Sequence, residues 1–213
     1  MKSYSSQILF REYFEGVLGA VFLALFLRFF VVSILFMPTE SMQPTLEKGD
    51  YVFGLRIAYG LPLPLMRGER LSPKLPARGD VVSFRFPGDE EQILIRRVVG
   101  LPGDQIEMMG GILRVNGSPV SQLLEGGSAR ERFPGRSTYR VRTRESLAFG
   151  PFTVPADHFF VLSDLREVRD DSRDWGAVPV RNLESRLQSI WLSLEPGQGL
   201  PKVRWQRMWR QLR

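Results

Sequence analysis

The strongest constraint on the fold is an apolar segment near the N-terminus. Residues 16–37 read GVLGAVFLALFLRFFVVSILFM, in which Arg28 is the only charged residue. As an α-helix this segment extends about 33 Å at about 1.5 Å per residue, enough to cross the hydrocarbon core of a bilayer. We therefore predict a transmembrane anchor over residues 16–36. A short cytoplasmic segment, residues 1–15, would precede it, and a folded domain, residues 37–213, would follow.

A cleaved signal peptide is the alternative interpretation of this segment, since the residues at 31–33, Val-Val-Ser, would tolerate cleavage. The preceding flank carries Glu12 and Glu15 beside Lys2 and Arg11, and the apolar run is longer than an ordinary signal-peptide core. These features favour a retained anchor. The basic residues of the flank favour a cytoplasmic N-terminus, so that a single pass would put the domain on the extracytoplasmic side of the cytoplasmic (inner) membrane.

The remainder of the chain is predicted to be mainly β. There are 20 Gly and 15 Pro, spread along the sequence, and short apolar stretches alternate with turn signals. The predicted strands are DYVFGL, GDVVSFRF, ILIRRVVGL, QIEMMGGILRVNG, STYRVRT, FFVLSD and QSIWLSL. Turns are predicted at residues 115–117 and 101–104. A long loop is expected over residues 59–77 and an exposed excursion over residues 125–136.

Composition excludes several kinds of site. Cysteine is absent and His158 is the only histidine, which rules out disulfides, a thiol nucleophile and a multi-histidine metal site. We expect neither a metal nor a cofactor. The net charge of +6 would suit nucleic acid or anionic lipid. No helix-turn-helix spacing or glycine-rich phosphate loop is present, so we do not expect a nucleic-acid partner.

Ser41 lies in PTESMQPTLEKGDYV, directly after the apolar run, where it could equally be part of a turn or a nucleophile. Four further motifs follow in order: YGLPLP, ARGDVVSFRFP, IRRVVGLPGDQI and VPADHFFVLSDLREVRDDSRDWGAVP. Together the five motifs closely resemble those of the bacterial type I signal peptidases. The resemblance implies a membrane-anchored serine endopeptidase with a signal-peptidase-like β-domain. It would remove signal peptides from exported preproteins, with those peptides and membrane lipid as its partners.

The resemblance also assigns roles by position. Ser41 would be the nucleophile, and its amide with the Thr39 hydroxyl would form the oxyanion hole, where fixed donors stabilise developing negative charge. The family's apolar pocket for small side chains falls on Met37, Pro38, Leu46 and Ile95, for which ordinary core packing is an equal alternative. Structural support falls on Asp164, Arg166, Arg169, Asp171, Ser172 and Arg173.

The resemblance to the family fails at the position of the general base. The family uses a Ser-Lys pair, and the lysine position here is Arg96. Arginine has an ordinary pKa of about 12.5–13.8, so its deprotonation at pH 7 would cost on the order of 9 kcal/mol. Arginine is therefore no base in a protein. The family's serine that supports the lysine is also replaced, by Arg169.

Three residues were considered as a relocated base. Lys48 and Lys74 lie outside the dyad motif, and His158 lies before a strand, where a structural role is the simpler interpretation. Two functions stay open: an impaired peptidase, and a non-catalytic protein that binds exported peptides or a membrane partner. Soluble self-cleaving repressors share the Ser-Lys arrangement, but the anchor argues against them.

The C-terminal tail, residues 202–213, is basic and aromatic. Trp205, Met208, Trp209 and Leu212 recur at helical spacing, with arginines on other faces. Such a segment would suit an anionic membrane surface. Docking against the β-domain is the equal alternative.

Overall fold

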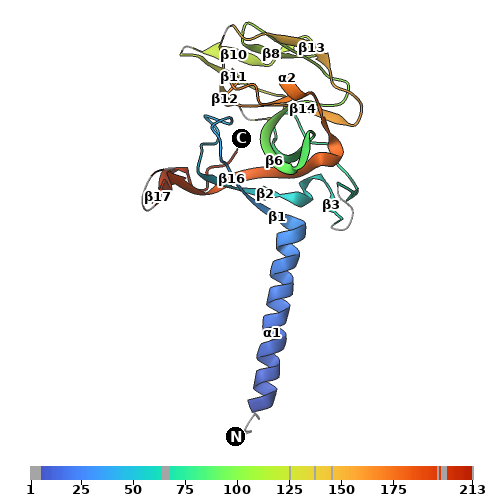
Figure 1. Ribbon diagram of the computed structural model, residues 1–213, viewed down its shortest axis with the longest axis vertical. Helices are drawn as coiled ribbons and strands as arrows, with labels where there is room; N and C mark the ends of the chain where they lie inside the picture. Colours follow the sequence, from blue (N-terminus) through green and yellow to red (C-terminus); the bar gives the residue numbers. More distant parts are fainter. Residues whose placement is uncertain are drawn as a thin grey trace.

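A long helix projects from a β-rich body (Figure 1). The computed structural model describes residues 6–63, 68–124, 126–136, 138–144, 146–195, 197 and 201–212. Helix α1 (Ser6–Phe26) continues into a π-helical segment, Leu27–Val31. Within the described ranges, one helix, Phe10–Val31, has the length and apolar composition to cross a membrane, and this fits a membrane-anchored protein. Residues 1–5 of the predicted cytoplasmic segment lie outside the described residues.

The bounds of the helix differ from the predicted 16–36. The helix begins at Ser6 and ends at Val31, and the last five residues of the predicted anchor form strand β1 (Val32–Phe36). These residues pair antiparallel with β2 (Asp50–Leu55), with Phe36 opposite Tyr51. β-branched and aromatic residues suit a pleated surface, so tertiary pairing overrides the helical continuation that hydropathy alone suggested. The body therefore begins directly where the helix ends.

The prediction of a mainly β body is confirmed. The largest sheet has eight strands in the order β1-β2-β16-β5-β6-β14-β15, and β17 pairs with β16. All its pairings are antiparallel. Its further strands are β5 (Val81–Phe86), β6 (Asp89–Gly100), β14 (His158–Leu162), β15 (Val178–Pro179), β16 (Leu183–Glu195) and β17 (Lys202–Val203). Most of the predicted strands fall on these elements because apolar runs between turns encode them.

Smaller sheets lie at the end of the body farthest from α1 (Figure 1). One has the order β13-β7-β8-β9 and another the order β10-β11-β12. Their strands are β7 (Gln105–Met109), β8 (Ile112–Val115), β9 (Ser118–Pro119), β10 (Ser121–Leu124), β11 (Ser128–Glu131), β12 (Tyr139–Arg142) and β13 (Phe149–Thr153). A core of buried residues, among them Ile106, Leu113 and Val141, packs these sheets together with β14.

The interpretation of residues 125–136 as an exposed excursion was wrong for the residues described. β11 is the central strand of its sheet, and Ala129, Glu131 and Phe133 are buried. Their alternation with exposed Arg130 and Arg132 is the period of a half-buried strand. Residue 125 lies outside the described residues.

The turns and the loop predicted from the sequence agree with the structure in the residues described. Asn116 and Gly117 have φ of 53° and 76°, as a tight hairpin requires, and Gly103 has φ of 84° in the turn that closes with Asp104. The predicted loop over residues 59–77 contains only the short pair β3 (Leu61–Pro62) and β4 (Arg70–Leu71), and its residues 64–67 are not described. Single-turn helices cover Arg56–Tyr59, α2 (Ser172–Trp175), Val180–Asn182 and Trp205–Arg207.

The C-terminal tail docks on the body instead of forming the helix that its spacing indicated. Arg207 Nη2 donates to Asp50 Oδ2 at 2.6 Å, and Arg204 Nη1 donates to Glu47 Oε2 at 2.8 Å. These ion pairs hold the tail along β16, with one single-turn helix at Trp205–Arg207. Trp205 and Trp209 stay 73% and 67% exposed. Membrane contact by the tail stays a prediction; residue 213 is not described.

Candidate active site

The segment that carries Ser41 is held against the main sheet by apolar side chains. Met37, Met42 and Leu46 are at most 1% exposed and belong to one core cluster with residues of β2, β5, β6 and β16. Burial of three such side chains fixes the turn between them. Ser41, within that turn, is 4% exposed.

The hydroxyl of Ser41 has one hydrogen-bond partner among the described residues. Its Oγ lies 3.0 Å from Thr39 Oγ1, and either hydroxyl can be the donor. The Ser41 carbonyl accepts from the Leu165 N–H at 2.9 Å, whereas no acceptor among the described residues takes the Ser41 N–H. An amide and a hydroxyl beside the nucleophile position are thus placed to donate to a bound carbonyl.

Three of the four predicted pocket residues come together. Met37, Leu46 and Ile95 share one apolar cluster with Met42, the residue after Ser41, while Pro38 is exposed. Ordinary core packing and a pocket for a small side chain both fit this arrangement.

Arg96 occupies the base position and is buried, with 2% exposure. Its Nε donates to the Asp170 carbonyl at 2.8 Å, and its Nη2 donates to Asp170 Oδ2 at 2.6 Å. Its Nη1 donates to the Ile95 carbonyl at 2.6 Å. Burial lowers the pKa of Arg96 from its ordinary value, and the carboxylates of Asp170 and Asp171 oppose that shift. Among the described residues, the guanidinium is directed to Asp170 and makes no hydrogen bond to Ser41.

Arg169, the second departure from the family pattern, also has an acidic partner. Its Nε lies 3.0 Å from Asp174 Oδ1, with both side chains about half exposed. No hydrogen bond or ion pair joins Arg96 to Arg169 within the described ranges. Each arginine is thus neutralised by its own aspartate, which sequence spacing alone did not indicate.

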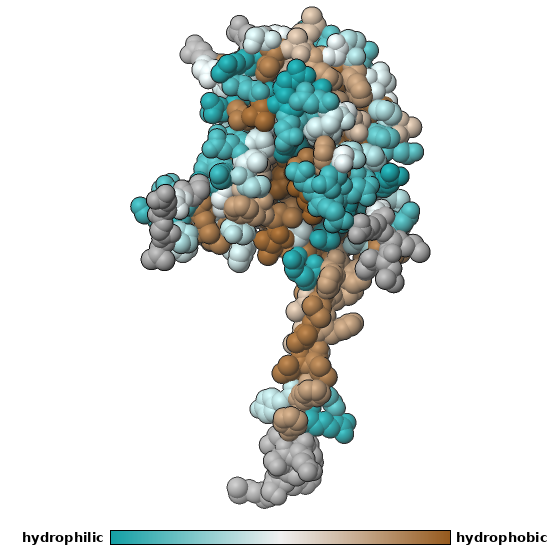
Figure 2. Space-filling view, viewed as in Figure 1, coloured by the Kyte–Doolittle hydropathy of each residue, from teal (hydrophilic) through white to brown (hydrophobic). Residues whose placement is uncertain are grey.

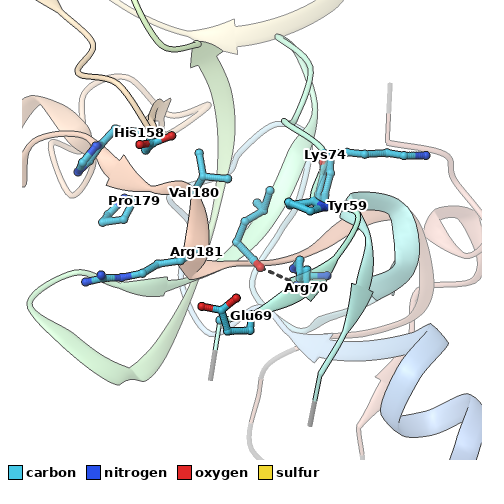
Figure 3. Close-up of a pocket in the computed structure, with 12 residues that line it drawn as sticks. Tyr59, Glu69, Arg70, Lys74, His158, Pro179, Val180 and Arg181 are labelled. Carbon is cyan, nitrogen blue, oxygen red and sulfur yellow. Dashed lines mark hydrogen bonds between the residues drawn. The ribbon is translucent and has the colours of Figure 1, made fainter. Parts of the chain in front are cut away.

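Lys48 is exposed at the end of the segment that carries Ser41, and the other two alternative bases lie elsewhere. Lys74 and His158 line a separate cavity of about 400 Å³, together with Tyr59 and Arg181 (Figure 3). His158 Nδ1 lies 2.7 Å from the Ala156 carbonyl, as expected for a structural histidine. Ser41 does not line this cavity.

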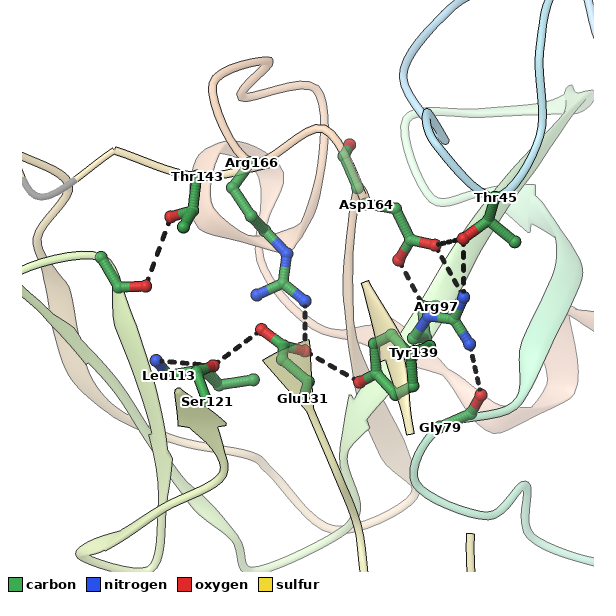
Figure 4. Close-up of polar contacts among 12 residues, drawn as sticks. Thr45, Gly79, Arg97, Leu113, Ser121, Glu131, Tyr139, Thr143, Asp164 and Arg166 are labelled. Atoms are coloured by element: carbon green, nitrogen blue, oxygen red, sulfur yellow. Dashed lines mark hydrogen bonds and ion pairs between the residues drawn. The ribbon is translucent and has the colours of Figure 1, made fainter. Parts of the chain in front are cut away.

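The supporting residues form buried ion pairs, one of which reaches the Ser41 turn. Arg97 donates to both oxygens of Asp164, at 2.8 and 2.6 Å, and both side chains are 0% exposed (Figure 4). Thr45 donates a short hydrogen bond to Asp164 and accepts from Arg97. The Arg97 guanidinium also lies 3.8 Å from the centre of the Tyr139 ring. Burial alone would lower the pKa of Arg97, but Asp164 raises it above its ordinary value.

The other supporting residues also pair. Arg166 Nη2 donates to Glu131 Oε2 at 2.7 Å, which ties the loop after β14 to β11 (Figure 4). Arg173 donates to both oxygens of Asp171, at 2.8 and 2.7 Å. The Ser172 hydroxyl accepts from the Val161 N–H of β14.

Sequence reasoning missed Arg97, Tyr139, Glu131 and Asp170 as members of this network. Arg97 could have been found, because a second arginine directly after Arg96 in a buried strand needs an acidic partner. Glu131 and Tyr139 come from strands far along the chain, and no local pattern pairs them with Arg166.

Known proteins are similar in sequence to most of this chain. The family profile "Signal peptidase, peptidase S26" matches residues 10–192. The chain belongs to the type I signal peptidase family. Signal peptidase I of Pseudomonas fluorescens is 33% identical over 205 residues, covering 85% of this chain and 72% of that protein. Signal peptidase I of Pseudomonas aeruginosa is 33% identical over 217 residues, covering 91% and 76%.

A crystal structure of a signal peptidase I from Enterococcus faecalis V583 is also similar. It has 28% sequence identity and a TM-score of 0.38, and it covers 54% of this chain and 97% of that one. Membership of the signal peptidase family implies signal peptides of exported proteins as substrates.

Proposed function

We propose that this signal peptidase homologue binds signal peptides at Ser41 but cleaves them very slowly or not at all. The observation that carries the proposal is Arg96, which stands at the position of the family's lysine, is buried, and is ion-paired to Asp170. Because a guanidinium offers only donors and a fixed positive charge, it cannot accept the proton of Ser41.

The remaining parts of a serine peptidase site support peptide binding. A peptide carbonyl placed at Ser41 would meet the Ser41 N–H and the Thr39 hydroxyl, both on the same turn. The apolar side chains of Met37, Leu46 and Ile95 would receive the small residue before the carbonyl. Nucleophilic attack additionally needs a base within hydrogen-bond reach of Oγ, and the described surroundings of Ser41 supply none.

The same features suit a non-catalytic role, which is the second candidate function. A protein that holds exported peptides or a membrane partner without cutting them needs no base, and the buried, ion-paired Arg96 is compatible with that role. In either case we place the N-terminus in the cytoplasm, with one pass of the inner membrane and the β-body outside.

Purified full-length protein, assayed on a signal-peptide substrate, tests the proposal. We expect cleavage by wild type to be absent or orders of magnitude below that of a signal peptidase I such as the Pseudomonas aeruginosa protein, assayed in parallel. Ser41→Ala should leave the residual rate unchanged, whereas binding of the uncleaved peptide should persist in both proteins. Robust wild-type turnover abolished by Ser41→Ala would refute the proposal and require a base among Lys48, Lys74 and His158.

A further inference from the structure

The outer face of β11 and β12 carries a cluster of arginines. Arg130, Arg132, Arg140 and Arg142, here named the arginine face, are all exposed and alternate with buried residues along the two strands and just past β11. Strand periodicity puts the buried residues toward the core and all four arginines on the opposite side. Hydrophilic residues predominate over much of this part of the body (Figure 2).

The arginine face has no paired carboxylate among the residues that the structure describes. Arg130 and Arg140 lie directly opposite each other in the antiparallel pair, an arrangement in which like charges destabilise a sheet. Within the described ranges, no carboxylate forms an ion pair with any of the four arginines. The nearest polar partner is Gln43, whose Oε1 lies 3.5 Å from Arg142 Nη1. Among the described residues, the guanidinium groups of Arg130, Arg132 and Arg140 thus have no hydrogen-bond or ion-pair partner, and Arg142 has only the neutral Gln43.

A groove of about 630 Å³ runs beside this face. Its lining includes Arg130 and Arg140 of the face, Arg207 and Arg210 of the tail, and Pro44 from the Ser41 turn. Glu47, the carboxylate that also lines the groove, already accepts from Arg204 and Arg207. The groove is therefore strongly cationic and open to an anionic ligand.

The arginine face lies one strand away from Ser41. The N–H of Leu165 donates to the Ser41 carbonyl, and Leu165 forms a parallel bridge with Arg142. The Arg142 N–H donates to the carbonyl of Asp164, which also binds Thr45. A polypeptide held at Ser41 can therefore continue onto the arginine face after a few residues.

The position of the face excludes the lipid that surrounds the anchor as its ligand. β10, β11 and β12 lie at the end of the body opposite α1 (Figure 1). Electrostatic attraction to a charged surface falls off within about 8–10 Å at physiological salt. The ligand must then be an anion that reaches this end of the body, as a chain leaving Ser41 away from the membrane does.

We propose that the arginine face and its groove bind an acidic segment of polypeptide, rich in Asp and Glu. Guanidinium groups pair with carboxylates through two parallel hydrogen bonds, which suits the exposed forks of Arg130 and Arg140. The inference rests on the proposed function only in assigning this segment to the polypeptide whose other part lies at Ser41. The bound polypeptide would then need an acidic segment in addition to the small residue at the Ser41 site.

Binding of a labelled peptide of alternating Glu and Gly residues tests the inference. The full-length Ser41→Ala protein, in nanodiscs of zwitterionic lipid, should bind this peptide and should bind its Gln-Gly counterpart much more weakly. Arg130→Ala combined with Arg140→Ala should raise the Kd about tenfold, and rising salt should weaken binding. Lys74→Ala combined with Arg181→Ala, which removes two charges at the separate cavity, is the matched control and should leave the Kd unchanged.

Three results would overturn the inference: equal binding of the Gln peptide, an equal effect of the control variant, or tighter binding of anionic vesicles or a single-stranded oligonucleotide. Because the peptide carries no signal sequence and the readout is binding in a Ser41→Ala background, the outcome is independent of whether the wild type cleaves. Failure of the proposed function and failure of this inference are thus seen in separate assays.

Discussion

Replacing Asp164 by alanine should destabilise the protein far more than removal of a surface carboxylate. Asp164 and Arg97 are both 0% exposed, and the carboxylate accepts two hydrogen bonds from Arg97 and one from Thr45. Without it the guanidinium still donates to the Gly79 carbonyl and the Thr45 hydroxyl and lies over the Tyr139 ring, but none of these three groups is a counterion. A buried charge left without its counterion costs about 3–5 kcal/mol.

This free-energy cost corresponds to a measurable shift in Tm. At about 2–4 °C per kcal/mol for a chain of this size, Tm of Asp164→Ala should fall by about 6–20 °C. Thermal unfolding of the detergent-solubilised full chain, followed by near-ultraviolet circular dichroism at pH 7, would measure it. Glu167→Ala is the control, because its partner Arg144 is 68% exposed and such pairs contribute about 1 kcal/mol at most.

A second variant separates loss of the ion pair from general disruption. Arg97→Met combined with Asp164→Leu removes both charges, so it should be less destabilised than Asp164→Ala. If Asp164→Ala costs no more than Glu167→Ala, or if the double variant is the least stable of the three, the reasoning about an uncompensated charge is refuted.

Three further predictions concern catalysis, acid stability and the membrane. Arg96→Lys with Arg169→Ser should raise signal-peptide cleavage in a Ser41-dependent way. Adding Asp170→Ala should raise it further, because Asp170 would otherwise hold the new lysine protonated; equal rates in a peptidase assay would contradict this. Burial alone would raise the pKa of Asp104, but the hydrogen bonds from Arg78 and others hold it below its ordinary value, so its stabilising effect is present above about pH 4 and lost as pH falls below that. Denaturant titrations should therefore show Asp104→Asn to be less stable at pH 7 and less sensitive to pH between about 5 and 3. Alkaline carbonate should leave the full-length protein in the membrane fraction; release of a shorter mature form would indicate a cleaved signal segment instead.

The sequence was informative where local pattern determines structure. Apolar runs between turn residues predicted the main strands, and the Asn116-Gly117 pair predicted its hairpin. The sequence did not predict structure that depends on residues distant along the chain. The end of the helix at Val31 depends on β2, about twenty residues later, which converts the next five residues into a strand.

At the candidate site, too, local motifs were predicted and distant partners were not. Motif order placed Ser41, Thr39 and Arg96, because each lies in a contiguous signature. The acidic partner of Arg96 could not be predicted, since Asp170 lies 74 residues away and only the packing of the loop after β14 brings it near. The helical spacing of the tail was overruled by the ion pairs that Arg204 and Arg207 make with Glu47 and Asp50.

The direct junction between the helix and β1 has a mechanical consequence. Val31 ends the helix and Val32 begins the strand, so no linker separates the helix from the sheet. Five extended residues span about 17 Å, and the turn with Ser41 follows within a few residues of the strand's end. The height of Ser41 above the lipid is thus set by how deeply the helix sits. In a thicker bilayer the whole body would therefore lie closer to the headgroups, because no linker could adjust its position.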